Sequence, residues 1–315
     1  MRQACHTRRQ AFSKGSYSNL RTQFRCYFGF CVYFNRALLP ADIRTICGFA
    51  QFLSRSVKPP TIRNYLSGVK MLHVFLGYEY QFTESFHLHL TLRGLERIHH
   101  HVPQRAKPIT ISVLLKVSQL SSHFSSFQRS VFACGLLLFF TMARVGSILP
   151  ASRHTPSFRF LTINRINFTQ EGILVTLLHT KTIQFGRRRL HIPIARSKSP
   201  ICPVHAYLAS ISSHHIPGSA PAFTFTDKAI IKILTKSLFI KGFRDLLCQA
   251  GVADHQSYSG HSFRRGGASW AFQCGMPGEL IQVCGDWASD AYKRYLEFST
   301  QDKVRLAALL VKGLP

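Results

Sequence analysis

A short break divides this chain into two regions with different residue patterns. Residues 99–108 read His-His-His-Val-Pro-Gln-Arg-Ala-Lys-Pro, with two prolines and no apolar period, which is typical of a linker. The histidines could bind a metal ion, but consecutive residues do not share a helix face, so a solvated linker is favoured. The 315 residues therefore predict two domains, at 10–100 and 111–315, joined by a linker at 101–110.

The first region carries the spacing of amphipathic helices. Apolar residues recur every three or four positions at Leu20, Phe24, Tyr27, Phe28, Cys31 and Phe34. Further helices are predicted at 40–53, after Pro60 with Gly77 as the stop, and more weakly at 88–98. Residues 10–100 are therefore predicted to form a small basic four-helix bundle.

The second region mixes helical and strand patterns. Alternating apolar residues predict strands at 157–163, 172–180 and 188–194, and the last two flank a hairpin with Gly186 at its tip. Helices are predicted near 111–121, 128–143, 229–250, 262–274, 277–284, 289–298 and 302–312. The predicted fold class is mainly α with a small β-sheet, as a helical bundle followed by an α+β domain.

The charge of the chain points to a polyanionic partner. Lysine and arginine number 40 against 13 aspartates and glutamates, which gives a net charge of +27. An excess of this size favours nucleic acid well ahead of an anionic membrane, and it is unusual for an enzyme of small metabolites. The most apolar run, 131–143, is too short to span a bilayer. We therefore expect a nucleic-acid partner, no membrane and no small-molecule substrate.

The cysteines and the N-terminal residues bear on the compartment. Nine cysteines are an odd number, and they form no Cys-x-x-Cys pair, which argues against a disulfide framework and a zinc ribbon. The first residues have no apolar core of a secretory signal peptide. We expect a reducing compartment, either the cytosol or the nucleus.

Three basic segments and one tyrosine are the candidates for chemistry, because none of the common hydrolase, kinase or dinucleotide-binding motifs occurs. The candidates in chain order are Arg144, Lys181, His261 with Arg264, and Tyr295. Taken singly, each has an ordinary explanation: an arginine at a helix C-terminus, a charged hairpin edge, a core histidine and a core tyrosine.

Together, these residue types match phosphodiester transfer without a metal ion. Two guanidinium groups can hold the nonbridging oxygens of a phosphate and stabilise the transition state. A tyrosine hydroxyl can attack phosphorus and become covalently linked, while a histidine takes up its proton. A hairpin lysine can protonate the departing 5′ hydroxyl. We expect no metal and no cofactor.

Two boxes around these residues resemble the tyrosine recombinases, also called phage-type integrases. Gly260-His-Ser-Phe-Arg-Arg-Gly-Gly-Ala is similar to the family's His-x-x-Arg box. Cys284-Gly-Asp-Trp-Ala-Ser-Asp-Ala-Tyr-Lys-Arg-Tyr-Leu is similar to its final box, in wording closest to recombinases of eukaryotic mobile elements, DIRS-type or Crypton-like. By position, the resemblance assigns the family's catalytic cations to Arg144, Lys181, His261 and Arg264, and its nucleophile to Tyr295.

The resemblance implies a fold and an activity. The fold is a SAM-like helical core-binding domain followed by a catalytic domain. The activity is DNA strand transfer for recombination or integration, in which duplex DNA is cut and rejoined through a 3′-phosphotyrosine, on paired sites and as a homo-tetramer. We expect a nuclear location. The alternative is a domesticated DNA-binding protein that has the recombinase fold and impaired catalysis.

Two positions depart from the family pattern. Ser147 stands where the family usually has Glu or Asp, and Asp286 stands where it usually has His or Trp. Because a carboxylate near a phosphate repels it, we expect Trp287 to turn in and give its indole N–H to the phosphate. Asp286 would then turn away towards a cation such as Arg265 or Lys293.

Further basic residues are candidates for contacts with the DNA backbone. They lie on the third predicted helix, beside the hairpin and in the His-x-x-Arg box: Arg63, Lys70, Arg187, Arg188, Arg189 and Arg265.

Overall fold

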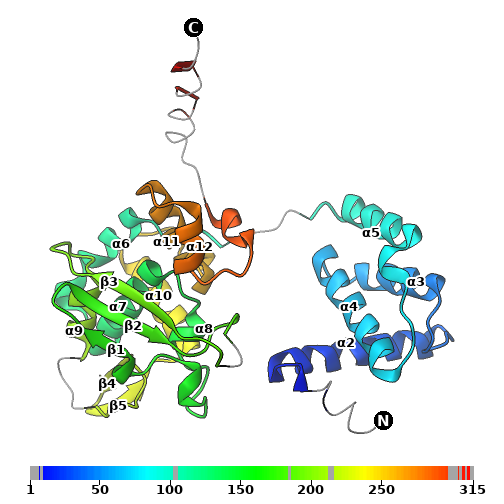
Figure 1. Cartoon of the computed structure of the whole chain (residues 1–315), viewed down its shortest axis with the longest axis horizontal. Helices are drawn as coiled ribbons and strands as arrows, with labels where there is room; N and C mark the ends of the chain where they lie inside the picture. The colour runs from blue at the N-terminus through cyan, green and yellow to red at the C-terminus, as the bar shows by residue number, and fades with distance from the viewer. Residues whose placement is uncertain are drawn as a thin grey trace. The chain divides into compact units, whose positions relative to one another are not determined.

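The computed structural model of the chain forms two compact units, one up to Gln104 and one from Arg105, each with a hydrophobic core of its own (Figure 1). It describes residues 10–101, 106–183, 186–211 and 216–296, together with residues 7, 304, 307, 308, 311 and 312. The predicted helix at 302–312 lies outside the described residues apart from these isolated positions. Among the described helices, none is both long and apolar enough to cross a membrane.

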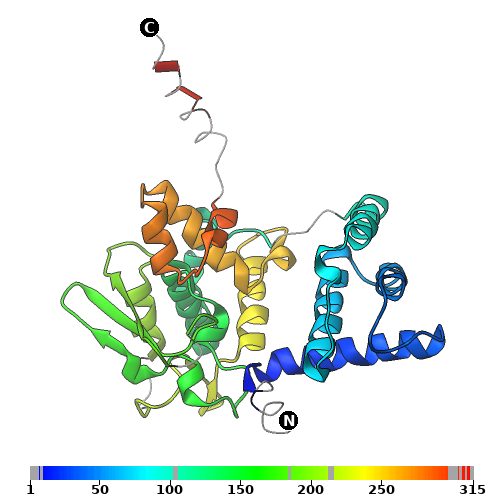
Figure 2. The ribbon, with the colours of Figure 1, turned by 45° about the vertical axis from the view of Figure 1, so that its right-hand side comes forward.

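The first unit contains the four helices that the apolar spacing predicts. They are α2 (Lys14–Tyr33), α3 (Ile43–Ser54), α4 (Pro59–Leu76) and α5 (Phe86–His99), with a 3-10 turn at Phe82–Glu84. Helix α3 begins where the Asp42 carboxylate accepts the Thr45 N–H at 2.6 Å, and α4 ends at Gly77, whose φ is 81°. Figure 2 shows α2 crossing α4 steeply. The core between the helices is aromatic and aliphatic: Tyr27, Phe30, Ile46, Phe49, Ile62, Val69 and Leu95.

The second unit is built around α7 (Ser126–Thr141), which is buried along most of its length. Its first turn is closed by a capping box of Ser125 and Gln128. The other helices are α6 (Ile111–Ser118), α8 (Val145–Ile148), α9 (Pro203–Ile211), α10 (Lys236–Gln249), α11 (Gly260–Gln273) and α12 (Gly278–Cys284). Helices α9, α10 and α11 all pack against α7.

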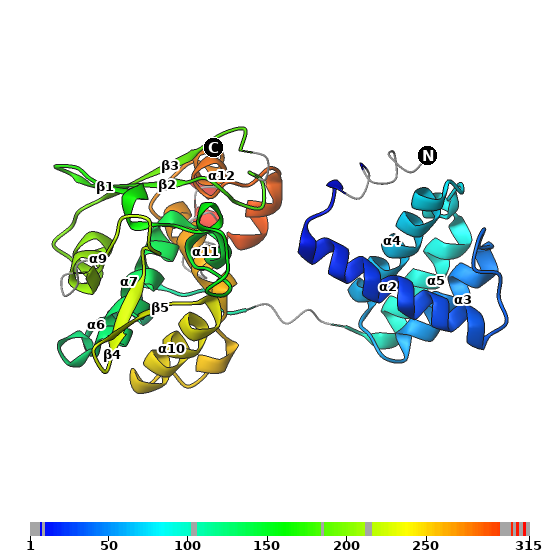
Figure 3. The ribbon, with the colours of Figure 1, turned by 90° about the horizontal axis from the view of Figure 1, so that it is seen from below.

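Two small antiparallel sheets lie on either side of α7 (Figure 3). One has the order β1-β2-β3, from Ile166–Phe168, Gly172–Leu177 and Leu190–Ala195. In its register Val175 pairs with Ile166 on one side and Ile192 on the other, and all three side chains are buried. The other sheet is a hairpin of β4 (Thr224–Asp227) and β5 (Ile230–Ile233).

Several segments differ from the sequence-based expectation. The strand predicted at 157–163 is wrong, since 3-10 turns form at Ser157–Arg159 and Ile163–Arg165. Between them Phe160 and Leu161 are buried, so the apolar pattern reflects a loop on the core rather than a strand. The helix predicted from 229 starts only at Lys236, because the Ile-rich run before it pairs as β5.

The second half of the predicted linker packs within the second unit. The N–H groups of Lys107 and Ile109 donate to the carbonyl oxygens of Ser257 and Ser262, at 3.3 and 3.0 Å. The Ile109 side chain is fully buried. Residues 106–110 therefore form part of the framework on which α11 rests.

Candidate active site

Arg144 stands at a sharp corner of the chain just past α7. Helix α7 ends at Thr141, and Met142 follows in the left-handed conformation, with φ 51°. The chain then turns so that Arg144 is the N-cap residue of the short helix α8, where its carbonyl oxygen accepts the Ser147 N–H at 2.8 Å. Ser147 is buried and Arg144 is half-buried. The corner therefore places the charged Arg144 side chain just beyond the apolar C-terminal end of α7.

Arg264 is placed by the close packing of α11. A Cβ on Gly266 would lie 1.8 Å from the Ile109 carbonyl oxygen, and one on Gly267 would lie 2.1 Å from that of Phe139 in α7. Any side chain at these two positions would push α11 away from its neighbours. The glycines after the two arginines therefore seat the helix so deeply that Arg264 becomes an interior residue.

The Arg264 guanidinium is buried without enough partners. Its side chain is only 1% exposed, and Nη1 donates to the Met142 carbonyl oxygen. Nε and Nη2 have no hydrogen-bond partner among the described residues. Burial, and secondly the nearby Arg144, lower the pKa of Arg264 to about 9, so it is still charged at neutral pH. A buried cation with orphan donors is costly, and an anion would satisfy it.

Trp287 packs its ring face on this guanidinium. The central carbon of the Arg264 guanidinium lies 3.6 Å from the Trp287 ring centroid, which is a close cation–π contact. A Cβ on Gly285 would lie 1.6 Å from the same ring, so only glycine fits there. The Trp287 and Tyr295 rings are 5.7 Å apart. The indole thus neighbours both the arginine and the predicted nucleophile.

His261 and Lys181 share the electrostatic surroundings of the two arginines. The pKa of His261 is lowered from 6.5, first because the surrounding protein removes water from its ring, and then because Arg264, Arg144 and Lys181 are nearby cations. His261 keeps an exposed surface at the start of α11. Three of the predicted cations therefore surround His261, which is neutral near pH 7 and able to accept a proton.

Tyr295 and its neighbour Tyr292, three residues earlier, have different surroundings. They lie in a 3-10 segment, Asp290–Tyr295, where the sequence predicted an α-helix at 289–298. Tyr292 is buried, and its hydroxyl packs over Gly278, where a Cβ would lie 2.7 Å from it. Tyr295 is half-buried, and it acts electrostatically on Arg264. The Tyr295 ring therefore lies beside Trp287, which packs on Arg264.

Neither a family model nor a curated protein matches this sequence. Solved structures do match it. A lambda integrase dimer bound to a COC′ core site is 13% identical with a TM-score of 0.58, covering 93% of this chain and 91% of that chain. XerH recombinase in a post-cleavage complex with palindromic difH substrate is 14% identical with a TM-score of 0.57, covering 86% and 73%. The Tn1549 transposon integrase with circular intermediate DNA is 12% identical with a TM-score of 0.55, covering 84% of each chain.

The chain has the fold of the tyrosine recombinases. The match spans both units, and it confirms the fold class predicted from the sequence. Within this tyrosine recombinase fold, Asp286 and Trp287 are not arranged as the sequence analysis expected.

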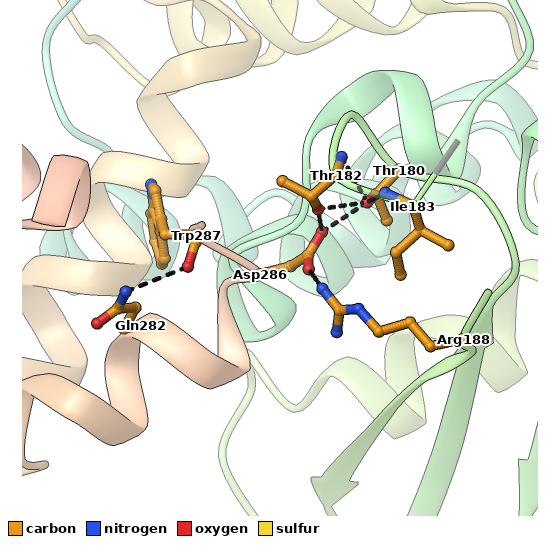
Figure 4. A network of polar contacts seen from close by, with 7 residues as sticks. All are labelled: Thr180, Thr182, Ile183, Arg188, Gln282, Asp286 and Trp287. Carbon is orange, nitrogen blue, oxygen red and sulfur yellow. Dashed lines mark hydrogen bonds and ion pairs between the residues drawn. The ribbon is translucent and has the colours of Figure 1, made fainter. Parts of the chain in front are cut away.

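Figure 4 shows Asp286 pointing toward the hairpin threonines and Arg188, not toward the expected partners Arg265 or Lys293. Its carboxylate forms an ion pair with Arg188, and it accepts the hydroxyls of Thr180, at 2.5 Å, and of Thr182. It lines a small pocket together with Arg144 and Arg264, and Trp287 does not. The expectation that Trp287 points into the pocket and Asp286 points away from it is therefore wrong. Asp286 accepts hydrogen bonds from the hairpin, and Trp287 packs on the Arg264 guanidinium.

The expected cation partners of Asp286 are elsewhere. Arg265 is 8% exposed and donates to the Ala106 carbonyl oxygen. Lys293 pairs with Asp290 at 2.6 Å. The bond to Ala106 directs the Arg265 side chain toward residues 106–110, and its contact with DNA stays a prediction.

The other predicted DNA contacts lie at the surface of their units. Arg63 pairs with Glu96 at 2.8 Å, and Lys70 donates to Thr83 at 3.2 Å. Both line a surface pocket of the first unit. Beside the hairpin, Arg187, Arg188 and Arg189 are all exposed, and Arg188 is bonded to Asp286. These positions are compatible with contacts to a phosphate backbone, which stay a prediction.

Sequence reasoning missed three residues of the site. Thr180 and Thr182 flank Lys181, and only the Thr-Lys-Thr pattern hints at them. Lys236 begins α10, and its Nζ would lie 2.8 Å from a Cβ on Gly146, next to Arg144. No motif marks Lys236. In the described part of the chain, no group of three His, Cys, Asp or Glu side chains is arranged to hold a metal ion.

Proposed function

We propose that this protein is a DNA strand-transfer enzyme that cuts and rejoins duplex DNA through a 3′-phosphotyrosine intermediate. The observation that carries the proposal is the buried guanidinium of Arg264, which has two unsatisfied donors and packs on Trp287, the ring that also neighbours Tyr295. A phosphodiester supplies the anionic oxygens that those donors lack. Its phosphorus is the electrophile that a tyrosine hydroxyl can attack.

In the proposed reaction each side chain has one task. Arg144 and Arg264 bind the nonbridging oxygens of the scissile phosphate and stabilise the charge of the pentacoordinate transition state. The Tyr295 oxygen attacks phosphorus, and His261 takes up the hydroxyl proton. The bond from phosphorus to the 5′ oxygen breaks, and Lys181 gives that oxygen a proton. Attack of a 5′ hydroxyl on the phosphotyrosine reverses these steps and reseals a strand, so the proposal needs neither a metal ion nor ATP.

Trapping of a covalent adduct tests this proposal. A duplex with a nick close to the cleavage site loses a short 5′ fragment after attack, so resealing fails and the protein stays linked to the DNA 3′ phosphate. The full-length protein should form an adduct that survives denaturation. Because the target sequence is not known from this chain, the substrates should come from a library of nicked duplexes.

A second candidate function is DNA binding by a domesticated recombinase fold with impaired catalysis. The observation that favours it is the pair of departures at Ser147 and Asp286, both of which line the pocket beside the arginines. Under this alternative, the protein binds duplex DNA and forms no adduct with any member of the library.

The finer parts of the proposal rest on the sequence resemblance. We propose assembly as a homo-tetramer on paired sites, an origin in a eukaryotic mobile element and a nuclear location. The solved relatives in complex with core-site, difH and circular intermediate DNA support duplex DNA as the partner.

Binding to duplex DNA should depend steeply on salt. With about 6–10 phosphate contacts, the affinity should fall about 10³–10⁵-fold between about 50 and about 200 mM salt, because counterions compete for the phosphates. Replacing the exposed Arg189 with glutamine should reduce the slope of log affinity against log salt by about 1. Fluorescence anisotropy at several salt concentrations measures both, and an affinity indifferent to salt would count against a DNA-binding surface.

Lys181→Ala should affect chemistry far more than binding. Loss of the proton donor should slow cleavage about 10²–10⁴-fold, the usual range for general acid catalysis. A substrate with a 5′-bridging sulfur has a leaving group that needs no proton, so it should recover most of the lost rate. Single-turnover cleavage of both substrates measures the effect. If sulfur brings no recovery, Lys181 contacts the DNA without donating a proton.

A further inference from the structure

Lys181 sits in a tight turn organised by its two threonine neighbours. The Thr180 N–H donates to the Ile183 carbonyl oxygen at 3.2 Å. In return, the Thr180 hydroxyl oxygen accepts the N–H groups of Thr182 and Ile183 at 3.2 and 3.1 Å. Thr180 is buried, whereas Lys181 and Thr182 are exposed. The turn therefore has a fixed centre and presents Lys181 outward.

Asp286 fastens this turn to the C-terminal segment. A hydroxyl carries one proton, and both threonine hydroxyls give theirs to Asp286 Oδ2. Their own oxygens are 2.9 Å apart because they converge on that acceptor. Arg188, from the other side of the hairpin, bonds to Oδ1. Hydrogen bonds to an ionised acceptor are roughly twice as strong as neutral ones, and this carboxylate is only 6% exposed.

The backbone at Asp286 suits this task. It follows α12 with φ 55°, a left-handed conformation that Asp and Asn adopt more readily than most residues. The next residue is Trp287, which packs on both Arg264 and Tyr295. One short segment therefore touches the hairpin, the buried arginine and the tyrosine. Arg188 also neutralises the carboxylate, which removes its repulsion of a phosphate.

We propose that Asp286 is a positioning residue that holds the Lys181 turn in place relative to Arg264 and Tyr295. It takes the place of the family's His or Trp without contacting the phosphate, and it acts through Thr180 and Thr182. The inference rests on the proposed function, since Lys181 is the proton donor only if the protein cleaves DNA.

The test variant is Asp286→Asn, which keeps the size and the tolerance of a left-handed backbone but removes the charge and one acceptor oxygen. It should cleave an ordinary substrate about 10–100-fold more slowly, because misplacement of a catalytic group by about 1 Å has effects of this order. DNA affinity should be unchanged or slightly higher. The 5′-sulfur substrate should recover most of the rate, as for Lys181→Ala.

Two further variants sharpen the assignment. Thr180→Val with Thr182→Val removes the donors and should reproduce the pattern of Asp286→Asn. In a Lys181→Ala background, Asp286→Asn should cost little more, because the turn then carries no proton donor. The matched control is Asp290→Asn, an exposed carboxylate four residues on that pairs with Lys293, and it should cleave like the wild type.

Amide hydrogen exchange tests whether Asp286 holds the Lys181 turn, and it needs no measurement of cleavage. In the DNA-free protein, the Thr182 and Ile183 amides should exchange faster in Asp286→Asn than in the wild type or Asp290→Asn. Unchanged exchange, wild-type cleavage by Asp286→Asn, or slow cleavage that sulfur does not restore would each overturn the positioning role. If the wild type yields no adduct at all, the proposed function falls, and the exchange rates decide separately whether Asp286 holds the turn.

Discussion

Tyr295→Phe should abolish the covalent adduct that the wild-type protein forms with a nicked duplex. Phenylalanine keeps the ring that packs against Trp287 and removes only the oxygen that would attack phosphorus. No other group of the proposed site replaces that nucleophile, so adduct formation should drop below detection. Denaturing gel electrophoresis of labelled substrate measures the adduct, and anisotropy should show DNA affinity within about 2-fold of the wild type, because the phosphate-binding cations are intact.

Tyr292→Phe is the matched control for this result. Tyr292 is three residues earlier in the same 3-10 segment, but its ring is buried in a cluster with Trp287 and its hydroxyl packs over Gly278. This variant should form the adduct like the wild type. If Tyr292→Phe loses the adduct while Tyr295→Phe keeps it, Tyr292 is the nucleophile and the assignment of Tyr295 by its position in the final box is wrong.

Local sequence signals predicted most helices of this fold. Apolar spacing, proline starts and glycine stops mark α2 to α5, and the same signals mark α6, α7, α11 and α12, because these features act within a few residues. The failures lie where tertiary contacts decide. The segment with Phe160 and Leu161 has the apolar alternation of a strand, but it is a loop whose side chains are buried in the core. The apolar residues of β5 directly precede those of α10, so the sequence pattern does not separate the strand from the helix.

The site was predictable in part for the same physical reason. The residue types of Arg144, Arg264 and Tyr295 carry their chemistry, and the two boxes that resemble the family mark Arg264 and Tyr295 in the chain. The partners of Asp286 carry no such mark, because Thr180 and Thr182 are 106 and 104 positions away. An electrostatic argument about one carboxylate and one phosphate predicted that Asp286 turns away. It failed because Arg188 and two hydroxyls compensate the charge where Asp286 stands.

Arg264 combines a high folding cost with a specific ligand requirement. Replacement of a buried ion by an apolar side chain of similar volume is often neutral or stabilising, because the charge no longer has to leave water. Nε and Nη2 of Arg264 have no partner among the described residues, so replacing Arg264 breaks no hydrogen bond of these two atoms there. The bond to Met142 and the contact with Trp287 act in the opposite direction.

Arg264→Met should therefore leave the fold intact while cleavage collapses. The free energy of unfolding should either rise or stay within about 1 kcal/mol of the wild type. For a unit of this size, about 1 kcal/mol corresponds to a change in melting temperature of about 2–4 °C. Cleavage should fall about 10³-fold or more, since the transition-state oxygens lose a charged donor in a site sheltered from water. Calorimetry and single-turnover cleavage measure the two quantities.

Arg165→Met is the control with the opposite pattern. Arg165 is half-buried, and its guanidinium donates to the backbone carbonyl oxygens of Ser157 and Phe160 at 3.1 Å each. Its loss should lower the free energy of unfolding by about 1–2 kcal/mol, because those carbonyls lose their donor, and it should leave cleavage by the folded protein near the wild-type rate. An Arg264→Met protein that unfolds more easily than Arg165→Met and still cleaves would make Arg264 a structural arginine. The phosphate would then have to be held elsewhere.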